Sequence, residues 1–251
     1  MRFYDFVHDT FIITQEQEQT FELQAGLVSA LYEFSRVLGL PIELLKYRSE
    51  EQEEGEVLVP VEIEVDSDVL FTARTESFLI APHFRSKINL IYNKIVKNHI
   101  PLGPQKRISD SEEEFMVNLL SDKAAKEKIK ENISALDNTC ASIIDKYEDY
   151  GLKHIIISSY DGSPLKSYNV ELDSAFKICR KMRTIPIVKE YQWKYRLIAQ
   201  KGLYIINSGT GVKIDDFFMP FYYILVTSET AMLGDSPTTI YQKINDVFIE
   251  E

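Results

Sequence analysis

LKHIIISSYDGSPLKSY, residues 152–168, is the stretch that decides the fold of the second half of this chain. It contains three consecutive isoleucines at 155–157, then Asp-Gly-Ser-Pro at 161–164 and a short return segment. β-Branched residues favour pleated structure, and Asp and Gly tolerate the backbone angles that a chain reversal needs. The stretch therefore predicts a β-hairpin whose turn lies at 161–164.

Helical patterns lie on both sides of this hairpin. Apolar residues recur at three- and four-residue spacing before and after it, which predicts one long helix at 123–150 and another at 171–185. A second hairpin follows, with its turn at Lys201–Gly202, and then a Gly-rich loop, SGTGVKIDD, at 208–216. The strand FFMPFYYILVTSE and a closing helix complete the pattern. The predicted order is helix, two strands, helix, three strands, helix.

The first half of the chain has a similar order of predicted elements. Its pattern predicts two strands, a helix, three strands and a helix. The predicted segments are 3–7, 11–14, 21–39, 43–47, 57–65, 69–75 and 83–100. Between the halves, HIPLGPQKRISD breaks regular structure with two prolines and a glycine, and Ser111 with Glu114 predicts a helix-capping box after it.

The predicted fold class is α+β, with two similar domains that each hold a five-stranded antiparallel sheet with packed helices. The expected boundaries are a first domain at 1–98, a connector at 99–122 and a second domain at 123–251. With 251 residues and 45% hydrophobic residues, the chain is long enough for two packed cores.

Charge and cysteine content narrow the classes of partner. The net charge is −11, and residues 1–125 carry 12 Lys/Arg against 22 Asp/Glu. This excess of acid argues against nucleic acid, since phosphate binding needs clustered Lys and Arg. Cys140 and Cys179 lie in apolar helical patterns and are expected to be reduced structural thiols. No apolar run approaches the ~20 residues of a membrane span, so a cytoplasmic location is expected.

No motif of a known catalytic chemistry is present. SGTGVK, residues 208–213, lacks the spacing of a phosphate-binding P-loop. The four histidines are scattered without a zinc-ligand spacing, and no G-x-S-x-G sequence surrounds a serine. We therefore predict no catalytic, cofactor-binding or metal-binding residues, and we interpret Asp161 as a turn residue.

Two surfaces are candidates for partner contact. Val28 and Tyr32 form a small apolar patch on the flank of the first helix, which fits either the edge of a core or a partner surface. Lys177, Arg180 and Lys181 share one side of the helix after the hairpin, with Arg183 nearby in sequence. That cluster fits either a solvated helix face or a contact for an acidic partner.

The order of elements resembles two related protein families. The opening strands followed by the helix QAGLVSALYEFSRVLG resemble a longin domain. The second half, in which a helix precedes IIISSYDGSPL and YRLIAQKGLYIINS precedes the last helix, is similar to a roadblock (dynein light-chain) domain. The resemblance implies a profilin-like sandwich without catalytic residues that dimerises side by side and extends its partner's sheet.

The resemblance also implies a function and partners. It predicts a non-catalytic scaffold or regulator of a small GTPase, with nucleotide exchange as one form of regulation, in a trafficking or signalling assembly. The expected partners are the GTPase and a second longin- or roadblock-type protein, as a homo- or heterodimer, and through them the chain would reach membranes peripherally. The alternative is a small-molecule sensor of PAS-like type, with a ligand pocket under the aromatic strand at 217–224.

Overall fold

The computed structural model describes residues 45–46, 57–62, 70–76, 78–99, 108–182, 185–231 and 233–249, together with single positions between 30 and 38. The chain groups into two compact units. One unit contains Met1–Glu76 and Ile88–Ile108, and the other contains Ser77–Lys87 and Ser109–Glu251.

The second unit is built on a five-stranded antiparallel sheet. Its strands are β4 (Leu152–Ser158), β5 (Pro164–Tyr168), β6 (Gln192–Ile198), β7 (Lys201–Ile214) and β8 (Phe217–Ser228). They lie in the order β5-β4-β8-β7-β6, so the first and last strands of the unit are neighbours at its centre. The predicted hairpin is confirmed, since β4 pairs antiparallel with β5, although Pro164 already belongs to β5 and the turn ends at Ser163.

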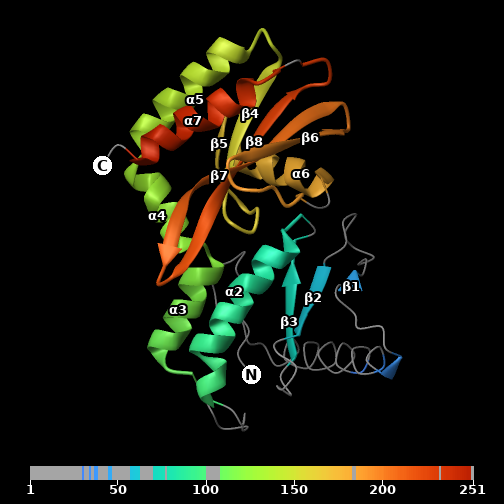
Figure 1. Ribbon diagram of the computed structural model, residues 1–251, viewed down its shortest axis with the longest axis vertical. Helices are drawn as coiled ribbons and strands as arrows, with labels where there is room; N and C mark the ends of the chain where they lie inside the picture. Colours follow the sequence, from blue (N-terminus) through green and yellow to red (C-terminus); the bar gives the residue numbers. More distant parts are fainter. Residues whose placement is uncertain are drawn as a thin grey trace. The chain divides into compact units, whose positions relative to one another are not determined.

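Helices cover both faces of this sheet (Figure 1). The helices α5 (Ile133–Tyr147) and α7 (Ser236–Ile249) pack together on one face, and α6 (Leu172–Met182) covers the other. Two further helices, α3 (Asp110–Leu120) and α4 (Lys123–Glu131), precede α5. The α6 face is a continuous apolar core, in which Ala175, Cys179 and Met182 pack on sheet residues such as Ile156 and Ile224. The α+β class with a five-stranded antiparallel sheet is thus confirmed for this unit.

A short segment before α2 (Ala81–Lys94) completes the core of the second unit. Phe78 and Ile80 are fully buried in the α6 face. The backbone N–H of Ile80 donates to the carbonyl of Asp161 at 2.8 Å, and the N–H of Ile185 donates to the carbonyl of Phe78 at 3.2 Å. These contacts place residues 77–87 with the second unit, whereas the sequence pattern placed them within 1–98.

In the first unit, three strands form an antiparallel sheet in the order β1-β2-β3. They are β1 (Leu45–Lys46), β2 (Val57–Glu62) and β3 (Leu70–Thr75), and the end of α2 is followed by a 3₁₀ turn, η1 (Val96–His99). The strands predicted at 3–7 and 11–14 and most of the helix at 21–39 lie outside the described residues. The five-stranded plan of the first half therefore stays a prediction.

The helix predicted at 123–150 is divided by Asn132 into α4 and α5. The side-chain amide of Asn132 donates to the carbonyl of Lys128 at 3.0 Å, and so competes for an acceptor that the helix would use itself. The capping box also lies two residues before the predicted one. Ser109 and Glu112 cap α3 reciprocally, because S-x-x-E occurs at both spacings and the helix begins at Asp110.

The predicted loop at 208–216 is wrong, because β7 continues to Ile214 and reverses directly into β8. Gly211 pairs with Pro220 in this ladder, and a Cβ at Gly211 would clash with the backbone of Met219. The glycines here mark an irregular, close strand pairing instead of a loop. The turn of the preceding hairpin lies at Ala199–Gln200, both with positive φ, and not at Lys201–Gly202.

Candidate functional site

The strand β6 forms an open edge of the second unit. It pairs with β7 along its whole length and has no strand on its other side among the described residues. Most of its side chains are exposed on both faces of the sheet. An open strand edge presents backbone N–H and C=O groups that another chain can pair with.

An apolar stripe accompanies this edge. Trp193, Tyr195 and Leu197 alternate along β6 and so share one face of the sheet. The indole of Trp193 is half-buried and its Nε1–H lies 3.4 Å from the hydroxyl of Thr238 on α7. The next two side chains on this face are more exposed, with Tyr195 at 43% and Leu197 at 54%. Exposed apolar side chains on an open strand are the features that a protein interface uses.

The opposite edge, β5, is protected. It has only five residues and begins with Pro164, which has no N–H to offer a partner strand. Lys166 on this strand pairs with Asp137 of α5 at 3.4 Å. Short length, proline and charge are the devices that discourage edge pairing. The two edges of the sheet therefore differ: β5 is short and begins with proline, whereas β6 has seven residues and no proline.

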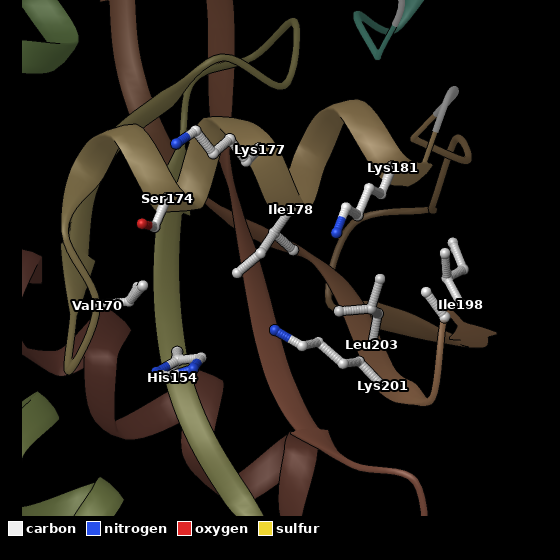
Figure 2. Close-up of a pocket in the computed structure, with 10 residues that line it drawn as sticks. His154, Val170, Ser174, Lys177, Ile178, Lys181, Ile198, Lys201 and Leu203 are labelled. Atoms are coloured by element: carbon white, nitrogen blue, oxygen red, sulfur yellow. The ribbon is translucent and has the colours of Figure 1, made fainter. Parts of the chain in front are cut away.

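The predicted basic cluster contributes to a hollow on the α6 face of the sheet (Figure 2). Lys177 and Lys181 line it from α6, and Lys201 and His154 line it from β7 and β4. Arg180 is half-buried and does not line the hollow. The conformation of Arg183 and the predicted patch of Val28 and Tyr32 lie outside the described residues.

The electrostatic character of the hollow is visible at His154. Its Nδ1 lies 2.9 Å from the carbonyl of Asn169, which orients the ring. Burial lowers the pKa of His154 and the ammonium groups of Lys201 and Lys153 lower it further, whereas the bond to Asn169 acts in the opposite direction. Two lysine ammonium groups thus lie close enough to His154 to affect its charge.

A buried cluster of three charges lies deeper in the same unit. The ammonium of Lys87 contacts Asp122 at 2.6 Å and Asp161 at 2.7 Å, and the three residues are 0%, 7% and 3% exposed. Asp161 also accepts hydrogen bonds from the hydroxyl of Ser159 and the N–H of Ser163. The turn interpretation of Asp161 is therefore incomplete, since its carboxylate is also a buried ion-pair partner.

The three groups of this cluster influence one another's protonation. Burial by itself lowers the pKa of Lys87, but the two carboxylates outweigh it and the pKa lies above its ordinary value. Burial and the charge of Asp161 raise the pKa of Asp122 to about 6, against the opposing effect of Lys87. Burial would also raise the pKa of Asp161, yet Lys87 and the hydrogen bonds lower it. All three side chains lie too deep for a substrate to reach, so we assign the cluster to structure.

The sensor alternative requires a pocket under the aromatic residues of β8. Phe221, Tyr222 and Tyr223 of β8 are fully buried. The hydroxyl of Tyr223 donates to Oδ1 of Asn245 at 2.8 Å, and the hydroxyl of Tyr222 lies 3.4 Å from the carbonyl of Val188. The hollow near Lys181 has none of these three residues in its lining. The sensor alternative therefore stays a prediction.

Sequence reasoning missed Lys87 and the partners of Lys181. Lys87 lies between Phe84 and Ile91 on the apolar stripe of α2, and a charge in such a stripe was the available signal for a buried ion pair. Lys201 and His154 join Lys181 only through the order of the strands in the sheet. No sequence spacing connects them.

Within the described part of the chain, no helix is long and apolar enough to cross a membrane. The same residues contain no group of three or more His, Cys, Asp or Glu placed to hold a metal ion. No protein-family model matches the chain, and no curated protein matches its sequence.

Proposed function

We propose that this chain is a non-catalytic protein-interaction module that scaffolds or regulates a small GTPase in a trafficking or signalling assembly. It pairs with a second longin- or roadblock-type protein, either another copy or a relative, through the β6 edge. The observation that carries this proposal is the open strand β6, on which Tyr195 and Leu197 are exposed. Strand pairing would satisfy its outer backbone groups, and the two side chains would add buried apolar area.

The order of elements supports the proposed class of partner. From α5 onwards the second unit runs helix, hairpin, helix, three strands, helix, which is the order that the roadblock resemblance implies. Shared architecture alone does not establish a function, because one fold serves many activities. Because the β5 edge is protected and the β6 edge is open, we expect the module to assemble through β6.

Sedimentation of the full chain over a concentration series tests the pairing. We expect Tyr195→Lys/Leu197→Lys to weaken self-association, or association with a co-purified relative, by at least about tenfold, because charges at a strand edge oppose pairing. Phe218→Lys is the control, since Phe218 is similarly exposed, at 41%, but lies on β8, which is not an edge strand. If the double variant and the control associate equally, β6 is not the interface.

Pull-down with the small GTPases of the source cell tests the second part. The purified chain should retain at least one of them, and release of a fluorescent nucleotide shows separately whether the contact accelerates exchange. If no GTPase is retained in either nucleotide state, the GTPase assignment is wrong, while the pairing through β6 is decided by sedimentation alone.

A further inference from the structure

The hollow between α6 and the sheet has the size and lining of a small ligand site. Its volume is about 340 Å³, at the lower end of the roughly 300–1,000 Å³ that ligand pockets occupy. Its apolar lining residues are Val170, Ile178, Ile198 and Leu203, and Figure 2 shows Val170 and Ile198 at opposite sides of the hollow. Figure 2 shows Lys181 extending from α6 and Lys201 from β7 into the same hollow, near Ile178 and Leu203.

The rim of this hollow is cationic. Lys177, Lys181 and Lys201 line it, and no Asp or Glu among the described residues does so. None of these three lysines has an ion-pair partner within the described part of the chain, whereas Lys87 and Lys166 do. Figure 2 shows the ammonium of Lys177 on the side of Ser174, farther from the centre than the other two. Lys181 and Lys201 are therefore the central cations.

We propose that this hollow binds a small organic phosphate, with the phosphate between Lys181 and Lys201 and an apolar portion over Ile178 and Leu203. Lysine ammonium groups bind phosphate as point charges, and two of them balance the double charge of a phosphate monoester. A bound phosphate would also neutralise the mutual repulsion of the Lys181 and Lys201 ammonium groups, which adds to its affinity. His154, held by Asn169, offers its other ring nitrogen at the edge of the same site. This proposal does not rest on the proposed function, although Ile198 at one end of the hollow also belongs to β6.

Titration of the full chain with phenyl phosphate, followed by the NMR signals of the His154 ring, tests the proposal. Phenyl phosphate combines a dianion with an apolar ring, so we expect it to bind more tightly than inorganic phosphate and than neutral benzyl alcohol. Lys181→Gln/Lys201→Gln should weaken binding at least tenfold. Lys189→Gln/Lys243→Gln removes the same charge from two exposed lysines that do not line the hollow, and should leave the affinity within about twofold.

Three results would overturn the proposal. One is the absence of any shift of His154 at millimolar phenyl phosphate. Another is an equal loss of affinity in both double variants, which would indicate attraction by net charge alone. The third is binding to phosphatidic acid vesicles but not to phenyl phosphate, which would make this face a membrane contact and not a pocket for a soluble ligand. Circular dichroism of each variant confirms that the fold is retained.

Discussion

The ammonium of Lys87 lies 2.7 Å from Oδ2 of Asp161, although the two residues are 74 positions apart in sequence. Lys87 is on α2 and Asp161 is in the turn between β4 and β5. Asp122, at the junction of α3 and α4, completes the cluster from a third direction at 2.6 Å. One buried ammonium thus joins three separate parts of the second unit, with two carboxylates around it.

Replacing Lys87 should test the strength of this junction. Lys87→Met leaves two carboxylates buried without a counter-charge, and we expect the free energy of unfolding to fall by about 3–5 kcal/mol. Urea denaturation followed by circular dichroism measures this loss. Lys87→Met/Asp122→Asn/Asp161→Asn retains similar volume without charge and should recover part of the stability. An equally unstable triple variant would show that packing, and not charge, dominates.

Neutralising Asp161 and neutralising Asp122 should change the free energy of unfolding differently. At neutral pH, Asp161→Asn should destabilise by about 2–4 kcal/mol, because Asp161 pairs with Lys87 and accepts from Ser159 and Ser163. Asp122→Asn should be neutral or stabilising, since burial and Asp161 disfavour its charge. Asn also tolerates the left-handed backbone of Asp122, whose φ is 57°. A larger loss for Asp122→Asn than for Asp161→Asn would contradict this assignment.

The pH dependence of stability follows from the same pKa shift. The pKa of Asp122 rises from 3.8 to about 6 on folding, so its contribution is present below about pH 4 and is lost as pH rises to about 6. Relative to Asp122→Asn, the unsubstituted protein should therefore lose about 1–3 kcal/mol across this window. Asp161 has the opposite sign, because its lowered pKa makes its contribution disappear as pH falls below 3.8. Urea denaturation of both proteins at several pH values measures the difference, and parallel curves would refute it.

The pairing of β7 with β8 at Gly211 gives a prediction about backbone packing. An alanine Cβ at Gly211 would meet the carbonyl of Met219, which cannot rotate away. Gly211→Ala should therefore destabilise by about 3 kcal/mol or more. Gly234→Ala is the comparison, since nothing lies within 4 Å of its Cβ and only its φ of 53° opposes alanine, at about 1 kcal/mol. Thermal denaturation compares the melting temperatures of the two variants. Equal values would contradict the close contact between Gly211 and the backbone of Met219.

The two cysteines should be unreactive in the folded protein. Burial raises the pKa of both Cys140 and Cys179 to about 12, and both are fully buried and unpaired by a disulfide. A thiol reagent at neutral pH should label neither until the second unit unfolds, because the thiolate is the reacting form. Mass spectrometry over a urea series counts the labels, and prompt labelling of either residue would disagree with this packing.

Local sequence was enough to predict much of the second unit. The isoleucines at 155–157 and the turn at 161–164 defined the hairpin, and apolar periodicity defined α6 and α7, because these signals depend on neighbours along the chain. The same signals failed at Asn132 and Gly211. Asn132 ends a helix through one side-chain hydrogen bond, and Gly211 belongs to a strand because a neighbouring backbone lies against it.

The candidate sites depended more strongly on tertiary structure. The sequence by itself determined the basic side of α6, with Lys177 and Lys181, and the reduced state expected of the two cysteines. Only the sheet order brought Lys201 and His154 to Lys181, and only the position of α7 left Tyr195 exposed on β6. The physical reason is that charge and periodicity are properties of a segment. A shared hollow, an open edge and a buried ion pair arise when distant segments meet.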